Sequence, residues 1–244
     1  MKKIVVCLVL IVLATLSWAQ GDREKVLGRI SEAGNVMNEI MSAPDAGIPD
    51  EILGSAQCVA VVPSMLKGGF IVGAAYGKGV ASCKTDKGWS APAFFRVEGG
   101  SFGLQIGGQA VDLVMVIMNE RGMRALLSSK FKLGADASVA AGPVGRHAEG
   151  ATDWKMRAQV LTYSRARGVF AGITLNGAVV KQDRDDTRAF YGRMVPFRLL
   201  LTGAHPAPAD ANPFLETLGH YAPVKSAETP AATTPAAEKQ AEKQ

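Results

Sequence analysis

The fold class is decided by residues 58–84, which read CVAVVPSMLKGGFIVGAAYGKGVASCK. The helical period of the preceding residues stops here, and short apolar runs rich in Val alternate with glycines. This pattern predicts three short strands, at 58–62, 69–75 and 79–84. Pro63 is expected to end the first strand, and Gly77-Lys78 to form a turn before the third.

The chain on either side of this stretch completes the architecture. Further strands are predicted at 89–97, 101–106, 110–118, 158–165 and 169–180. Helices are predicted at 22–41, 49–57, 119–128, 183–191 and 212–221. The first helix carries one apolar stripe, made of Val26, Ile30, Ala33, Met37 and Ile40. We therefore expect an α+β fold, with a curved, mostly antiparallel, half-barrel-like sheet flanked by N-terminal and C-terminal helices.

The first residues have the features of a secretory signal peptide. Lys2 and Lys3 precede an apolar run, and Ser17-Trp18-Ala19 places small residues where a signal peptidase cuts. The apolar stretch 4–19 has 16 residues, fewer than the ~20 that span a bilayer as a helix. We therefore predict cleavage after Ala19 and a periplasmic or envelope-associated protein.

The rest of the chain divides by composition. Of 244 residues, 48% are hydrophobic, which supports one globular domain or two. After the signal peptide (1–19) we expect a domain at 20–195 and a helical extension at 196–221. The segment 222–244 is rich in Pro, Ala, Lys and Glu and is expected to be a disordered tail.

Two cysteines, Cys58 and Cys83, remain after cleavage. In an exported protein such a pair favours a disulfide, and two buried free thiols are the alternative. In a plain three-stranded meander over 58–84 the cysteines would flank the middle strand, about 10 Å apart. That separation exceeds disulfide reach. A disulfide here therefore predicts a strand order other than a simple meander.

Charge and composition narrow the class of partner. Without Lys2 and Lys3 the chain has 25 basic and 22 acidic residues, a net charge of +3. This weak positive charge permits contact with anionic lipid but does not indicate a nucleic-acid-binding protein, and aromatic residues make up only 7%. The three histidines lack metal-ligand spacing, so we predict no metal site and no cofactor.

Two motifs resemble catalytic or phosphate-binding signatures but lack the neighbouring residues that such sites require. Gly99-Gly-Ser-Phe-Gly103 matches G-x-S-x-G, but the residues after Ser101 alternate like a strand rather than starting a helix. Gly73–Gly79 is one residue too short for a phosphate loop and lacks its Ser or Thr. We assign no catalytic residue and interpret 183–186 as a solvated helix N-terminus, with a structural role for Asp112.

Several longer segments together resemble one family. They are Gly68–Gly79, Gly88–Ala93, Gly99–Gly107, Leu133–Arg146, Tyr163–Gly172 and Ala189–Gly192. In this order they resemble the SYLF domain family over roughly residues 25–195. Eukaryotic members of that family bind phosphoinositides at membranes, and fungal members also bind actin. Bacterial members with a signal peptide resemble lipid-binding proteins of the envelope.

The resemblance implies a non-enzymatic, phospholipid-binding protein of the periplasm or envelope. The alternative is a structural or protein-interaction module with an envelope partner. Actin is expected to be an unlikely partner, because an exported protein would not ordinarily meet it. In the family the first helix contributes to membrane contact, a role that would fall here to Arg23, Lys25 and Arg29.

Basic residues at predicted strand ends and loops are the candidates for a lipid headgroup site. They are Lys67, Lys78, Arg146, Arg165 and Arg167. If they converge on one face they would bind an anionic headgroup. If they do not, they are dispersed, solvated charges.

Overall fold

The computed structural model of the chain describes residues 2–43, 47–69, 72–102, 107–143, 158–166, 169–171 and 175–224. The helices are α1 (Lys2–Met41), α2 (Asp50–Ser55), α3 (Glu120–Leu127), α5 (Arg184–Tyr191), α6 (Phe197–Leu201) and α7 (Asn212–Tyr221). The strands are β1 (Cys58–Gly69), β2 (Val72–Thr85), β3 (Gly88–Trp89), β4 (Ala93–Phe102), β5 (Gly107–Ile117), β6 (Lys130–Lys132), β7 (Val139–Ala141), β8 (Val160–Ala166), β9 (Val169–Ala171) and β10 (Val179–Gln182).

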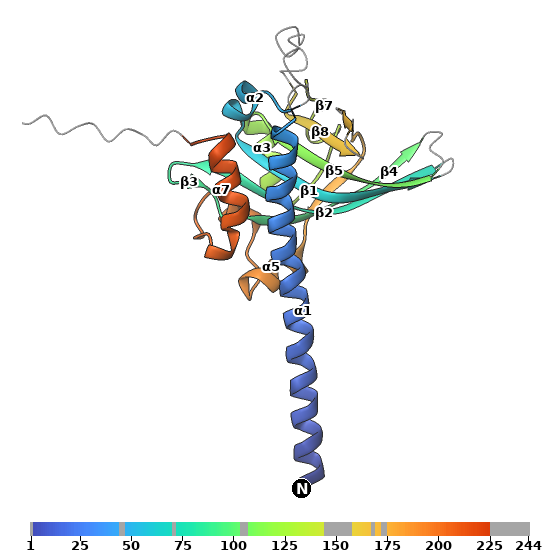
Figure 1. Ribbon diagram of the computed structural model, residues 1–244, viewed down its shortest axis with the longest axis vertical. Coiled ribbons are helices and arrows are strands. Elements are labelled where there is room, and N and C mark those ends of the chain that lie inside the picture. Colours follow the sequence, from blue (N-terminus) through green and yellow to red (C-terminus); the bar gives the residue numbers. More distant parts are fainter. Residues whose placement is uncertain are drawn as a thin grey trace, which may run out of the picture.

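The strands form one curled sheet in the order β6-β10-β4-β2-β1-β5-β8-β7 (Figure 1). Among the described strands only β7 and β8 pair in parallel. The edge strands β6 and β7 are separated in the chain only by residues 133–138. A flat sheet of eight strands is about 34 Å wide, but this connection spans about 24 Å at most. The sheet therefore curls, and the predicted half-barrel α+β fold is confirmed.

Residues 58–84 form one long hairpin of β1 and β2, and the prediction of three strands was wrong. Pro63 does not end β1, because the strand continues through a bulge between Val62 and Met65. At the bulge Ser64 takes a left-handed conformation, with φ of 50°. Proline is tolerated at such a position because a bulged residue need not donate to the ladder.

The predicted turn at Gly77-Lys78 is also wrong, since β2 runs straight through it. A Cβ atom on Gly79 would lie 2.4 Å from the carbonyl oxygen of Val61, and one on Gly77 would lie 2.5 Å from Cγ1 of Val62. The two glycines are therefore required for close packing of β2 against β1, not for a change of direction.

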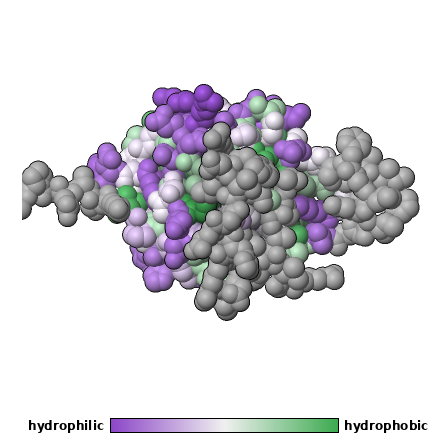
Figure 2. Space-filling view, turned by 90° about the horizontal axis from the view of Figure 1, so that it is seen from above, coloured by the Kyte–Doolittle hydropathy of each residue, from purple (hydrophilic) through white to green (hydrophobic). Residues whose placement is uncertain are grey.

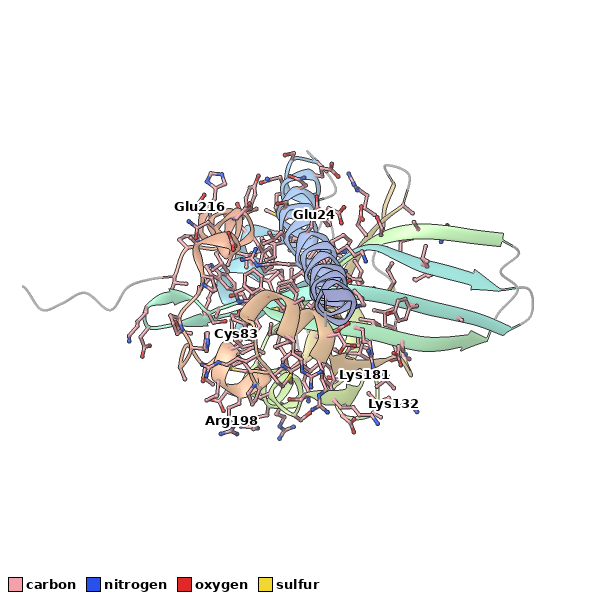
Figure 3. The ribbon with its side chains drawn as sticks, turned by 90° about the horizontal axis from the view of Figure 1, so that it is seen from below. Glu24, Cys83, Lys132, Lys181, Arg198 and Glu216 are labelled. Atoms are coloured by element: carbon pink, nitrogen blue, oxygen red, sulfur yellow. A yellow bond between two sulfur atoms is a disulfide. The ribbon has the colours of Figure 1, made fainter. Side chains whose placement is uncertain are left out.

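The hairpin places Cys58 directly opposite Cys83. Their Cα atoms are 3.9 Å apart and the sulfurs form a disulfide, as predicted. The disulfide required a strand order other than a simple meander. The structure meets this requirement, because the two cysteines lie on neighbouring strands. Cys83 is labelled in Figure 3.

Two cores lie on opposite faces of the sheet. We call the face toward α1 the outer face and the opposite one the inner face. On the inner face Phe95 and Leu113 pack with Phe197 of α6. On the outer face Phe94 packs with α1 and with Phe214 of α7. All five residues of the predicted α1 stripe are buried, so that prediction is confirmed.

Helix α1 continues beyond the sheet at its N-terminal end. Its first half extends away from the body of the molecule (Figure 1), and Val26 is the first of its residues in the outer core. Among the described residues, no helix has both the length and the apolarity that crossing a membrane requires.

The predicted strand at 169–180 is two strands on different parts of the sheet. β9 pairs with β8, whereas β10 pairs with β4 and β6. Gly177 has a φ of +87° just before β10, which permits a tight change of direction there. The chain thereby crosses from one side of the sheet to the other and places α5 beside α1.

Candidate functional site

Two groups of ion pairs hold α1 against the outer face. In the first, Nζ of Lys78 on β2 lies 2.8 Å from Asp183 and 2.9 Å from Asp186. Asp186 also pairs with Arg29 of α1. Asp183 Oδ1 caps α5 by accepting the N–H groups of Asp185 and Asp186, each at 3.1 Å. The group thus links one strand to two helices.

This group corrects the interpretation of 183–186 as a solvated helix N-terminus, because the Asp183 side chain is fully buried. Burial would raise the pKa of Asp183, but Lys78 and the backbone N–H groups outweigh burial and hold that pKa below its ordinary value. Burial would lower the pKa of Lys78, but its two carboxylate partners raise it. Both groups stay charged at neutral pH, and the charge of Lys78 is neutralised within the protein.

The second group lies near the C-terminal end of α1. Nη2 of Arg165 on β8 is 2.8 Å from Oδ2 of Asp112 on β5, and Arg165 also pairs with Glu39 of α1. Asp112 Oδ1 accepts the N–H of Ser64 at 2.9 Å. Asp112 therefore stabilises the β1 bulge and positions Arg165, which is the structural role expected for it.

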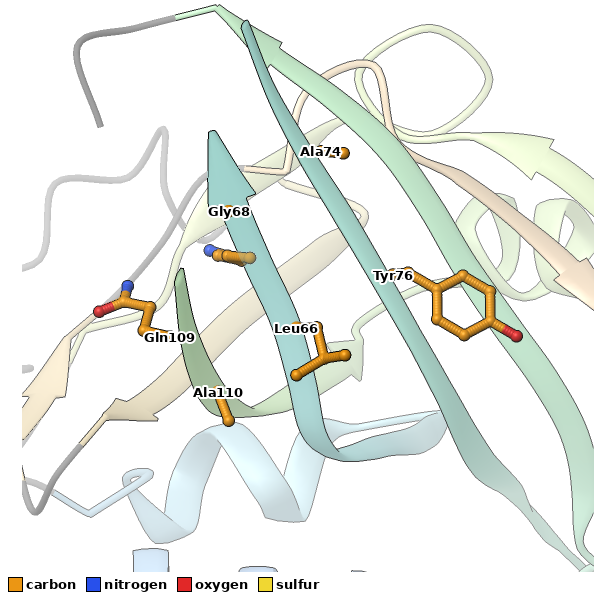
Figure 4. Close-up of a pocket in the computed structure, with 7 residues that line it drawn as sticks. Leu66, Gly68, Ala74, Tyr76, Gln109 and Ala110 are labelled. Carbon is orange, nitrogen blue, oxygen red and sulfur yellow. The ribbon is translucent and has the colours of Figure 1, made fainter. Parts of the chain in front are cut away.

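Beyond these ion pairs the outer face opens into an apolar groove (Figure 4). Its volume is about 480 Å³, and it is lined by Leu66, Lys67, Gly68, Ala74, Tyr76, Gln109 and Ala110. Leu66 lies opposite both Tyr76 and Ala110 in the sheet. Leu66 is 60% exposed and Tyr76 44% exposed. Adjacent large apolar side chains left open to water are typical of a contact surface.

Large exposed hydrophobic residues are few in the described part of the chain. The face seen in Figure 2 is a mosaic of hydrophilic residues with only small hydrophobic areas between them. Of the other large hydrophobic residues, Leu199 on α6 is the one that is also exposed within the described chain. The pairing of Leu66 with Tyr76 is therefore the distinctive feature of this region.

The structure does not bring the predicted headgroup residues together. Lys78 and Arg165 lie on β2 and β8, with β1 and β5 between them, and each is paired with two carboxylates. Arg146 and Arg167 lie outside the described residues. Lys67 lines the groove, and partial burial lowers the pKa of its ammonium group.

The basic residues predicted for membrane contact on α1 also have acidic partners. Arg23 lies 2.5 Å from Asp210, and Lys25 lies 3.1 Å from Asp22. Arg29 belongs to the Lys78 group, with a side chain only 16% exposed. The apolar stripe of this part of α1 is already occupied by the outer core.

The catalytic look-alike motifs lie in extended backbone. Ser101 is on β4 and pairs with Gly73 of β2, so it does not occupy the strand-to-helix turn of a hydrolase nucleophile. Among the described residues no three His, Cys, Asp or Glu side chains gather as metal ligands would.

Sequence reasoning missed Leu66 and Tyr76 as site residues. The bulge at Ser64 inserts one extra residue into β1 and changes which side chains face outward. Without knowledge of this shift in register, the sequence indicates that Leu66 is one more apolar core residue. The signal available was Tyr76, an aromatic side chain between small residues in a predicted turn region.

A curled sheet whose outer face opens into an apolar groove defines a binding domain. Residues 98–221, about half of the chain, match the Ysc84 family, described as "Las17-binding protein actin regulator". The chain therefore belongs to the Ysc84 family, the family of the SYLF domain, as its segments indicated.

The relatives are longer proteins. "SH3 domain-containing YSC84-like protein 1" of Rattus norvegicus is 34% identical over 182 residues, which cover 74% of this chain and 53% of that protein. The Homo sapiens protein of the same name is 33% identical over the same length and with the same coverage. "Protein YSC84" of Saccharomyces cerevisiae is 32% identical over 185 residues, covering 74% of this chain and 39% of that protein. The chain spans about half the length of these relatives, or less.

The comparison bears on two expectations. The family consists of binding and regulatory proteins, which agrees with a non-enzymatic role at that level. The expectation that actin is an unlikely partner is not supported, because the family is described as an actin regulator.

Proposed function

We propose that this protein binds phospholipid through the apolar groove. The observation that carries the proposal is the exposed pair Leu66 and Tyr76 in a concave, largely apolar site. Acyl chains are the natural occupants of such a site, because they remove apolar surface from water without requiring hydrogen bonds. Lys67 also contributes to the lining, but it follows Leu66 on β1 and its side chain therefore points to the opposite face of the sheet, so we assign it no contact with a phosphate.

The groove is suited to hold part of an acyl chain. Completing the burial of Leu66 and Tyr76 contributes on the order of 2 kcal/mol, which is about 30-fold in affinity. Gly68, Ala74 and Ala110 add no bulk, so a chain can lie close to the backbone of β1, β2 and β5.

We propose that the protein acts outside the cytoplasm, in the periplasm or attached to the envelope. The basic and apolar pattern of residues 1–19 supports this location. Cleavage after Ala19 would leave the α1 stripe intact, because its first residue in the outer core is Val26. The Cys58–Cys83 disulfide is in keeping with an oxidising compartment.

Vesicle flotation tests the lipid proposal. Leu66→Asn with Tyr76→Ser removes the apolar pair and should weaken vesicle binding by about 30-fold, from the burial estimated above. Leu199→Asn is the matched control, because it removes an exposed leucine from α6 and should leave binding unchanged. Absence of binding by the unaltered protein, or equal loss in both variants, contradicts the proposal.

Actin binding is a second candidate function. It is favoured by the family description and by the relationship to "Protein YSC84". Co-sedimentation with actin filaments tests it, with the groove variant included. Sedimentation with actin but no binding to vesicles would favour this function, or more broadly a protein-interaction role, over lipid binding.

A further inference from the structure

We infer that the free edge of β5 binds an extended peptide strand of a partner protein, with apolar side chains on one face of that strand and acidic side chains on the other. The edge consists of residues 107–111, which read GGQAV. The binding mode is strand addition, in which backbone hydrogen bonds supply affinity and alternate side chains supply specificity. The inference goes beyond the proposed lipid function and does not rest on it.

This part of β5 has a strand on one side only, as far as the described residues extend. β1 pairs with β5 along its whole length, whereas β8 pairs on the other side only from Asp112 to Ile117. The strands β1, β2, β4 and β5 project together from the body of the molecule (Figure 1). Residues 107–111 therefore form a sheet edge within the projecting part.

The register shows which backbone groups point outward at this edge. The N–H of Met118, directly after β5, donates to the carbonyl oxygen of Gln159 on the β8 side. Successive residues of a strand point their backbone groups to alternate sides, and β5 itself is regular because the bulge lies on β1. The N–H and C=O groups of Gly108 and Ala110 therefore point away from β1, where an added strand would bond to them.

The β5 edge lacks the features that keep edge strands from pairing. Such strands are commonly protected by lysines, prolines, bulges or short length. The edge strand β6 has three residues and a lysine at each end, and β7 also has three residues. Residues 107–111 contain no charge and no proline. The edge of β4 at 99–102 is partly covered, because Gly99 lies against Ala178.

On the outer face the side chains next to the edge are apolar. Ala110 lies opposite Leu66, whose side chain is 60% exposed. Residues directly opposite each other in a sheet share a face. Because Ala110 is small, a large apolar side chain opposite it on the added strand can reach Leu66 and remove apolar surface from water. The partner strand therefore presents apolar residues on this face.

On the inner face the same strand would meet an unpaired positive charge. Gln109 lies opposite Lys67, which has no ion-pair partner among the described residues. Glu98 and Asp112, the other charged residues of the projecting strand ends, both have cationic partners. A residue opposite Gln109 is two strands, about 10 Å, from the backbone of Lys67. The long side chains of Lys67 and of a glutamate there can meet across Gln109, which favours an acidic second face.

NMR of the backbone amides of the isotope-labelled full chain, titrated with capped peptides, tests the inference. The probe is Thr-Glu-Val-Glu-Val-Glu-Thr, which alternates acidic and apolar side chains as the two faces require. It should shift the amide signals of Gly108 and Ala110 most. Two control peptides should bind more weakly. One is Thr-Lys-Val-Lys-Val-Lys-Thr, in which the charge is reversed, and the other is Thr-Glu-Ser-Glu-Ser-Glu-Thr, which lacks the apolar side chains.

A matched pair of variants at one residue separates the edge from the fold. Ala110→Pro removes an outward N–H and no bond to β1, a change that an edge strand tolerates, and should weaken binding of the probe about tenfold. Ala110→Ser keeps the N–H and should bind like the unaltered protein. Thermal unfolding checks that both variants are folded. Independently, Lys67→Gln should weaken binding of the probe about fivefold.

Three results in the titrations would overturn the inference. They are equal binding of the acidic and lysine peptides, equal binding of the probe by the two Ala110 variants, and largest shifts on β4 rather than at 107–111. A dimer of the unaltered chain that Ala110→Pro dissociates would also overturn it, because a second copy would then occupy the edge. None of these results bears on vesicle binding, so the proposed lipid function is judged separately.

Discussion

Replacing Lys78 by Met tests whether the buried ion pairs hold α1, α5 and β2 together. The substitution leaves Asp183, whose side chain is fully buried, without its cation. Removing one partner of a buried pair costs about 3–5 kcal/mol in general. Asp183 keeps its two bonds from backbone N–H groups, and Asp186 keeps Arg29. We therefore expect the lower end, about 3 kcal/mol in the free energy of unfolding.

The assay is urea and thermal unfolding at neutral pH. A loss of about 3 kcal/mol corresponds to a fall in Tm of about 6–12 °C for a domain of this size. Adding Asp183→Asn to Lys78→Met should recover part of the loss, because the uncompensated buried charge is then removed. The matched control is Lys87→Met, a substitution of an exposed lysine, which should change stability by less than about 0.5 kcal/mol.

Two results would refute this reasoning. One is a Lys78→Met variant within about 0.5 kcal/mol of the unaltered protein. The other is a double variant with Asp183→Asn that is no more stable than the single variant. Either would mean that these charges are solvated and that α1 is held by apolar packing alone.

Three further predictions follow from the fold and the ion pairs. Replacing Cys58 and Cys83 by Ala should lower the free energy of unfolding by up to about 3.5 kcal/mol, from the loop that the disulfide closes, as measured by urea unfolding with and without reductant. Gly79→Ala should destabilise by about 1–3 kcal/mol, because its Cβ meets Val61; an unchanged Tm would contradict this. The pKa of Asp183 is lowered from 3.8, so its contribution to the free energy of unfolding should be present above about pH 4 and lost below it. The pKa of Lys78 is raised from 10.5, so its contribution should be lost only above about pH 10.5. Unfolding across this range should show a weaker acid limb in Asp183→Asn.

Much of the fold was predictable because it depends on local periodicity. The α1 stripe repeats every three or four residues, and burial of all five of its residues follows from that spacing. The presence of several strands in the middle of the chain was also predictable from the sequence. Strand boundaries were not, because Pro63 and Gly77 act as breakers in isolation but are accommodated by a bulge and by close packing within the hairpin.

The candidate site was less predictable, because its parts are distant in sequence. Lys78 was interpreted as a headgroup residue, and nothing near it in the chain shows that Asp183 and Asp186 neutralise it. Strand pairing likewise aligns Arg96 with lysines from β6 and β10. Only the pairing of strands from separate parts of the chain aligns them.

By itself the sequence determined the family and the helix that packs through its apolar stripe, and it favoured a disulfide between Cys58 and Cys83 that the pairing of β1 with β2 then placed within reach. These features depend on residue type and on spacing along the chain. Only the tertiary structure decided that Leu66 and Tyr76 face solvent together and which basic residues remain available to a ligand. The physical reason is that a bulge sets the face on which each later side chain lies, and long-range ion pairs decide which charges are neutralised.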